Sequence, residues 1–195
     1  MRMSGNPVSD NPRPAPVFDW PASDLIGTDR RGLPPAGAEG DVDAVRAVLQ
    51  EVLDPEVPAV SVVELGIVRE IAWHAGRLHV GVTPTYSGCP ATETIEAQIH
   101  EALVIAGYPD PRIERRLSPA WTTDWITDQG REKLRAFGIA PPSGARGRHG
   151  EAPVVACPQC GSEHTEPVSE FGSTACKALY RCVSCLEPFD YFKCL

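Results

Sequence analysis

Apolar side chains recur at three- and four-residue spacing in the central part of the chain, which predicts amphipathic helices there. A first helix is predicted to be capped by Asp41 and stopped by Pro55. A second is predicted to follow the corner at residues 88–90 and to end before Gly107. The predicted inward positions are Val42, Val45, Val48, Leu49 and Leu53 in the first helix, and Ile95, Ile99, Leu103 and Val104 in the second.

Runs rich in β-branched residues lie between and after these helices. Gly66–Trp73 and Leu78–Thr83 predict a hairpin that turns at Gly76, and Arg112–Leu117 predicts a third strand. A last short helix is predicted to be capped by Asp128 and closed by Gly138, with Leu134 and Phe137 facing inward. Helices and strands in this order predict an α+β domain.

Proline and glycine divide the chain into segments. Residues 1–40 are rich in both and lack a sustained apolar period, so they are predicted to be a disordered tail. The α+β domain is predicted to span residues 41–140. Residues 141–153 have the composition of a linker, and residues 154–195 form a separate cysteine-rich module.

Composition narrows the classes of function. The 195 residues suffice for one ordinary domain and a small second one. A formal net charge of -8 argues against nucleic-acid binding, because contacts to phosphate need clustered Lys and Arg. No apolar run has the length of a membrane span, and no secretory signal is evident, so we expect a cytoplasmic protein. In that reducing compartment, the seven cysteines are expected to be thiols or metal ligands.

Two C-x2-C pairs predict a structural zinc ion bound by Cys157, Cys160, Cys182 and Cys185. A two-residue spacer lets both sulfurs of a pair face one tetrahedral ion, and the module has too few large aliphatic residues to fold without it. Iron in a rubredoxin-like site is the alternative. The remaining cysteines of the module, Cys176 and Cys194, are interpreted as buried thiols, and they stay open as alternative ligands together with His164.

Cys89 stands where a predicted strand meets a predicted helix. Backbone N–H groups and the helix dipole at such a corner lower a thiol pKa, so Cys89 is a candidate metal ligand or nucleophile. The alternative is a small buried residue at a packed turn. Asp54 and Glu56 follow the first helix, where the dipole disfavours acids, so they are candidates for a functional role as well.

Three strings in the first part of the chain, DPEVP (Asp54–Pro58), ELGIV (Glu64–Val68) and TPTYSGCP (Thr83–Pro90), resemble the MIP18 (formerly DUF59) family of iron-sulfur assembly proteins. Three further strings resemble one subgroup of that family, the D subunits of the bacterial phenylacetyl-CoA epoxidase system. They are LSPAWTTDWI (Leu117–Ile126), FGSTACKALYRC (Phe171–Cys182) and EPFDYFKC (Glu187–Cys194). The subgroup usually closes with His where this chain has Leu195.

The resemblance implies helices on one face of a short mixed sheet, followed by a zinc ribbon. It also implies an accessory subunit, not an enzyme, that assists iron or iron-sulfur maturation of the other epoxidase subunits, including the reductase, with a homodimer left open. Cys89 would then hold iron or an iron-sulfur cluster transiently, supported by Asp54, Glu56, Thr83 and Thr85. The alternatives are a non-catalytic scaffold subunit and, less favoured, an enzyme with Cys89 as nucleophile.

Overall fold

The structure is a computed structural model and describes residues 39–142 and 153–193. Residues 1–38 of the predicted tail (1–40) and residues 143–152 of the predicted linker (141–153) lie outside the described residues, as does Cys194. The division into these segments therefore stays a prediction. No helix in the described part of the chain has the length and apolarity needed to cross a membrane.

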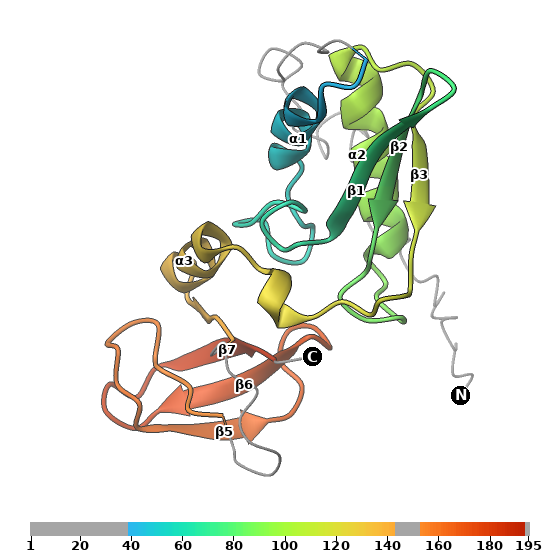
Figure 1. The fold of residues 1–195 in the computed structure, drawn as a ribbon. Helices are drawn as coiled ribbons and strands as arrows, with labels where there is room; N and C mark the ends of the chain where they lie inside the picture. The colour runs from blue at the N-terminus through green and yellow to red at the C-terminus, as the bar shows by residue number, and fades with distance from the viewer. Residues whose placement is uncertain (1–38, 143–152, 194–195) are drawn as a thin grey trace, which may run out of the picture. The chain divides into compact units, whose positions relative to one another are not determined.

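The first part of the chain folds as helices against a three-stranded mixed sheet. Its elements in chain order are α1 (Val42–Gln50), β1 (Val68–His74), β2 (Arg77–Val82), α2 (Thr92–Ala106) and β3 (Arg112–Arg115). Strand β2 is central, with β1 antiparallel and β3 parallel to it. In Figure 1, α2 runs along one face of this sheet. The predicted α+β class, with helices on one face of a short mixed sheet, is confirmed.

Local signals predicted α1 well but overestimated its length. Asp41 caps it as predicted, since its Oδ1 accepts a hydrogen bond from Ala44 N at 2.9 Å. The helix ends at Gln50, and Leu53 instead forms an isolated β-bridge with Ser61. The side chain of Leu53 is 43% exposed, so its predicted inward position is wrong.

Two other predicted inward residues, Val104 and Phe137, are exposed. The last helix, α3 (Asp128–Ala136), follows a short 3-10 turn, η1 (Thr123–Trp125), that the pattern did not predict. Its N-cap is Thr127, whose Oγ1 accepts from Gly130 N at 3.0 Å, so Asp128 is the first helical residue and not the cap. Gly138 closes the helix as predicted, with a positive φ of 93°.

A second sheet contains strands from both sides of the predicted linker. Its order is β4 (Ile139–Ala140), β7 (Pro188–Phe192), β6 (Lys177–Cys182) and β5 (Thr165–Ser169). Figure 1 shows β5, β6 and β7 as neighbouring strands. The two-residue strand β4 pairs in parallel with β7, so the chain that leaves α3 extends the sheet of the cysteine-rich module.

The main hydrophobic core also draws on this module. Cys176 and Phe192 are 4% and 1% exposed and belong to the same buried cluster as the inner faces of α1, α2 and β2. The Trp121 ring lies 6.0 Å from the Phe192 ring between centroids, and Trp121 Nε1 donates to Leu65 O at 2.9 Å. A separate small cluster lies around Cys157 and Cys182. The C-terminal module therefore helps to fill the core of the α+β domain.

A buried carboxylate fixes the segment between α1 and β1. Glu64 is 2% exposed, and its Oε2 accepts from Ser61 N at 2.9 Å, while Lys133 Nζ of α3 lies 2.6 Å from its Oε1. Two residues later, Gly66 has a φ of +70° and no room for a Cβ, which would lie 2.5 Å from Trp125 O. These contacts hold the segment that carries Leu65 and Ile67 in place.

Candidate functional site

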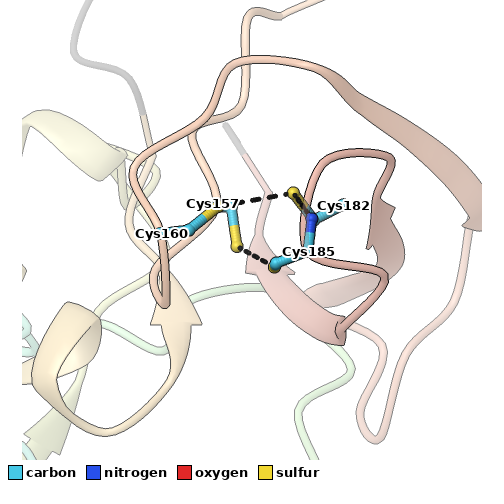
Figure 2. Close-up of side chains that lie close together, drawn as sticks. All are labelled: Cys157, Cys160, Cys182 and Cys185. Carbon is cyan, nitrogen blue, oxygen red and sulfur yellow. Dashed lines mark hydrogen bonds between the residues drawn. The ribbon is translucent and has the colours of Figure 1, made fainter.

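The structure brings together the four cysteines of the two predicted knuckles. Their Sγ atoms all lie within 4.8 Å of one another, and the pairs Cys157–Cys185 and Cys160–Cys182 are 3.7 and 3.6 Å apart (Figure 2). Four sulfurs at about 2.3 Å from a tetrahedral zinc ion lie about 3.8 Å from each other. The spacing fits zinc, and the four residues form a metal-binding cluster.

Both knuckles share one backbone hydrogen bond and one backbone conformation. Gly161 N donates to Cys157 O at 2.9 Å, and Leu186 N donates to Cys182 O at 3.0 Å. Both donors have positive φ, 73° at Gly161 and 68° at Leu186. Glycine adopts this conformation without strain, and the chain accepts it at Leu186 as well. A hydrogen bond from the Cys185 backbone lowers the pKa of Cys182 to about 6, which favours the thiolate that a metal requires.

The alternative ligands lie elsewhere. His164 is exposed and Cys176 is buried in the main core, and within the described residues neither joins this cluster. The 4% exposure of Cys176 agrees with a buried thiol that is not a ligand of this cluster. Cys194 lies outside the described residues.

Cys89 lies just before α2 and is half-buried. Its carbonyl oxygen accepts from Thr92 Oγ1 at 2.9 Å, which ties the corner to the first turn of the helix. The expected low pKa is wrong. Burial raises the pKa of the thiol, the nearby carboxylates of Glu56 and Asp54 raise it further, and the backbone N–H of Ala91 and the Thr92 hydroxyl offset this only in part.

The thiol of Cys89 lines a cavity that other predicted site residues also reach. The cavity has a volume of about 20 Å³, and Asp54, Glu56 and Thr85 line it too. Thr83 does not line this cavity and instead donates its backbone N–H to Ile67 O at 2.8 Å. Most of the remaining wall is apolar. It is formed by Val57, Leu65, Ile67, Val82, Pro84, Ile95 and Phe192.

Asp54 presents one oxygen to the backbone and leaves the other unused. Its Oδ1 accepts from Glu56 N at 2.8 Å and from Val57 N at 2.9 Å, and no hydrogen bond within the described residues involves Oδ2. The side chain is 7% exposed, and burial raises its pKa. Burial and the charge of Asp54 likewise raise the pKa of Glu56. A cation in the cavity would therefore find two carboxylates that form no ion pair with any described residue.

Sequence reasoning missed two residues of this cavity region. Cys176 lines the cavity, although it is remote from Cys89 in the chain. Next to it, Lys177 is buried, with its Nζ 3.8 Å from Asp190 Oδ2. Its positive charge lowers the pKa of Asp54, Glu56 and Cys176 against the effect of burial. The only sequence signal was that both residues fall within one string of the family resemblance.

Two family models match different parts of the chain. Residues 42–113 match the family model described as iron-sulfur cluster assembly protein, and residues 141–193 match the model described as PaaD zinc beta ribbon domain. Two solved structures cover about half of the chain. A DUF59 domain from Bacillus anthracis is 22% identical over 47% of this chain and 89% of its own, with a TM-score of 0.44. A Mycobacterium tuberculosis protein associated with Fe-S complex assembly and repair is 35% identical over 54% of this chain and 97% of its own, with a TM-score of 0.32.

A curated relative covers far more of the sequence. The Escherichia coli (strain K12) protein assigned as the D subunit of 1,2-phenylacetyl-CoA epoxidase is 49% identical over 158 residues, which are 81% of this chain and 96% of that protein. The chain therefore belongs to the family of 1,2-phenylacetyl-CoA epoxidase D subunits.

Proposed function

We propose that this chain is an accessory subunit that assists iron or iron-sulfur maturation of the other subunits of phenylacetyl-CoA epoxidase. The observation that carries the proposal is the cavity at Cys89, where a half-buried thiol shares one wall with a buried carboxylate, Asp54. Sulfur and carboxylate donors in one small cavity suit a divalent transition metal better than an organic substrate. The family models and the relative's name support the same proposal.

The metal of the C-terminal module is proposed to be zinc with a structural role. Four thiolates at tetrahedral spacing leave no open position for substrate, as is usual for structural zinc sites. The ion would hold β6 and the two knuckles together and would not itself be delivered to a partner. Cys89 would be the ligand for the delivered metal, with Asp54, Glu56 and Thr85 beside it.

The proposed partners are the other epoxidase subunits, including the reductase. The chain itself is proposed to be non-catalytic, with Cys89 binding metal and not acting as a nucleophile. A raised pKa keeps the Cys89 thiol largely protonated near neutral pH, which is unfavourable for a nucleophile. A metal ion can still displace that proton on binding.

The test is to produce the complete epoxidase system with Cys89→Ser in this chain and to measure iron and flavin in every other subunit. Serine keeps nearly the same volume and removes the soft ligand. We expect the variant chain to fold, a partner subunit to lose iron or cluster, and the cells to fail to grow on phenylacetate.

The control is Val104→Ser, which places serine on an exposed position of α2. It should leave the metal content of every subunit and growth on phenylacetate unchanged. Fully metallated partners and normal growth with Cys89→Ser would refute the maturation role. They would favour a scaffold subunit in which Cys89 is a packed turn residue.

A further inference from the structure

We propose that Cys176 of the C-terminal module is the second thiolate of the site at Cys89, and that the two sulfurs and Asp54 together bind a single ferrous ion, not a preassembled cluster. This inference rests on the proposed maturation function and deepens it, because it names the form of the iron and a ligand from the other part of the chain. Three observations carry it: the lining of the cavity, its size and its charges.

The cavity brings the two thiols to one space from distant parts of the sequence. Cys89 precedes α2 and Cys176 precedes β6, yet both line the same cavity, and Asp54 lines it with them. Cys176 is 4% exposed, and the only hydrogen bond of its Sγ atom within the described residues is with Thr174 Oγ1, at 3.0 Å. Because the thiol forms a single hydrogen bond, its side chain can rotate toward a cation without the loss of a larger hydrogen-bond network.

The size of the cavity suits one ion. A space of about 20 Å³ accommodates about one water-sized particle. A dehydrated divalent ion fits that space as it stands, whereas a cluster with several irons and bridging sulfides would need the cavity walls to move apart. The unused Oδ2 of Asp54, on a side chain that is 7% exposed, supplies a hard ligand beside the two soft ones. Sites with sulfur and oxygen ligands bind divalent transition metals, and iron(II) is one of them.

The charges around the cavity fit a dication. Two thiolates with Asp54 and Glu56 would be strongly anionic, and Glu96, which is paired with Arg115, lines the same mostly apolar cavity. The buried ammonium of Lys177 acts on Cys176 and on both carboxylates, so it offsets part of that charge. Ferrous iron offsets most of the rest, and each thiol releases its proton to solvent as the ion binds.

The site differs from the zinc cluster in one respect that suits a delivered metal. Within the described residues, only the four ribbon cysteines have three or more ligand atoms within 4.8 Å of one another. The cavity residues must therefore rotate their side chains to close around the ion. Part of the binding free energy is spent on that closure, so the ion is held less tightly and can be passed to a partner.

The test uses the full chain with zinc in the ribbon, titrated with Fe²⁺ alone without oxygen. We expect one iron per chain with visible thiolate charge-transfer bands. Cys176→Ser and Cys89→Ser should each lower the affinity for Fe²⁺ at least about tenfold, on the scale of a lost or disturbed ligand. The control, Val104→Ser, places serine on an exposed position of α2 that does not line the cavity, and it should bind Fe²⁺ as tightly as the unchanged chain.

A measurement on the unchanged chain removes any dependence on how the variants fold. X-ray absorption at the iron edge reports only on iron and not on zinc. We expect the spectrum to show two sulfur neighbours for each iron. One sulfur neighbour, or unchanged affinity in Cys176→Ser, overturns the role of Cys176 and leaves the maturation proposal intact. Bound sulfide with two or more irons per chain overturns the single ion. Loss of maturation is tested separately by the metal content of the partner subunits.

Discussion

Truncation of Phe192 should destabilise the α+β domain, although Phe192 belongs to the C-terminal module. Its side chain is 1% exposed and lies in the main core cluster, with its ring 6.0 Å from that of Trp121. Removal of a buried phenylalanine ring costs about 3–5 kcal/mol, and loss of the aromatic pair falls within that range. Since a domain is stable by about 5–15 kcal/mol, Phe192→Ala should remove a large share of the free energy of unfolding.

The assay is urea unfolding of the zinc-loaded chain, followed by far-UV circular dichroism, with thermal unfolding beside it. For a chain of this size, the expected loss lowers the Tm by about 6–20 °C. Phe137→Ala is the control, because Phe137 is 56% exposed and its truncation should cost less than about 0.5 kcal/mol. A loss below about 1 kcal/mol in Phe192→Ala, with zinc still bound, would mean that the module does not fill this core.

Three further predictions follow from local geometry. Gly66→Ala should lower the free energy of unfolding by about 2–5 kcal/mol, because it adds left-handed backbone strain and a clash with Trp125. Gly76→Ala is the control, with a φ of +78° and open space around it, and should lower the free energy of unfolding by only about 1–2 kcal/mol. Equal losses of the two variants in urea unfolding would contradict the clash. Burial opposes ionisation of Glu64, but its contacts with Lys133 and Ser61 lower its pKa below the ordinary value of 4.5. The stability lost in Glu64→Gln should therefore be constant above about pH 5.5 and should shrink as the pH falls through the lowered pKa, and a pH-independent difference in urea midpoints would refute this. Elemental analysis should find about one zinc per chain, and removal of the zinc by a chelator should lower the Tm of the whole chain. Iron without zinc in anaerobically purified protein would contradict the zinc assignment.

Signals contained within a few residues predicted the local structure. The Asp41 cap, the hairpin at Gly76, the Gly138 stop and the two C-x2-C knuckles each depend on backbone geometry that neighbouring residues determine. Periodicity was less reliable at the ends of helices. Phe137 has the right spacing for the inner face of α3 but lies at the C-cap, where no neighbouring element covers it.

Contacts between distant segments could not be predicted from the pattern. The ion pair of Glu64 and Lys133 joins the segment after α1 to α3. The sequence around either residue contains no signal that predicts the other as its partner. The same holds for the cavity. The position of Cys89 at a corner was evident from the sequence, but the helix dipole alone suggested a low pKa, because burial and the nearby carboxylates depend on the tertiary fold.

Strand β6 physically connects the two sulfur sites. It begins at Lys177, directly after the cavity residue Cys176, and ends at Cys182, a member of the four-cysteine cluster. Because β6 is hydrogen-bonded on both sides, to β5 and to β7, a metal that fixes Cys182 also fixes the position from which Cys176 reaches the cavity. In a chain without the ribbon metal, the knuckles would lose their common centre, β6 would be free to shift, and Cys176 would leave its place in the cavity wall. The ribbon metal therefore acts on the proposed iron site through the backbone, so that a chain without zinc should bind Fe²⁺ no better than Cys176→Ser.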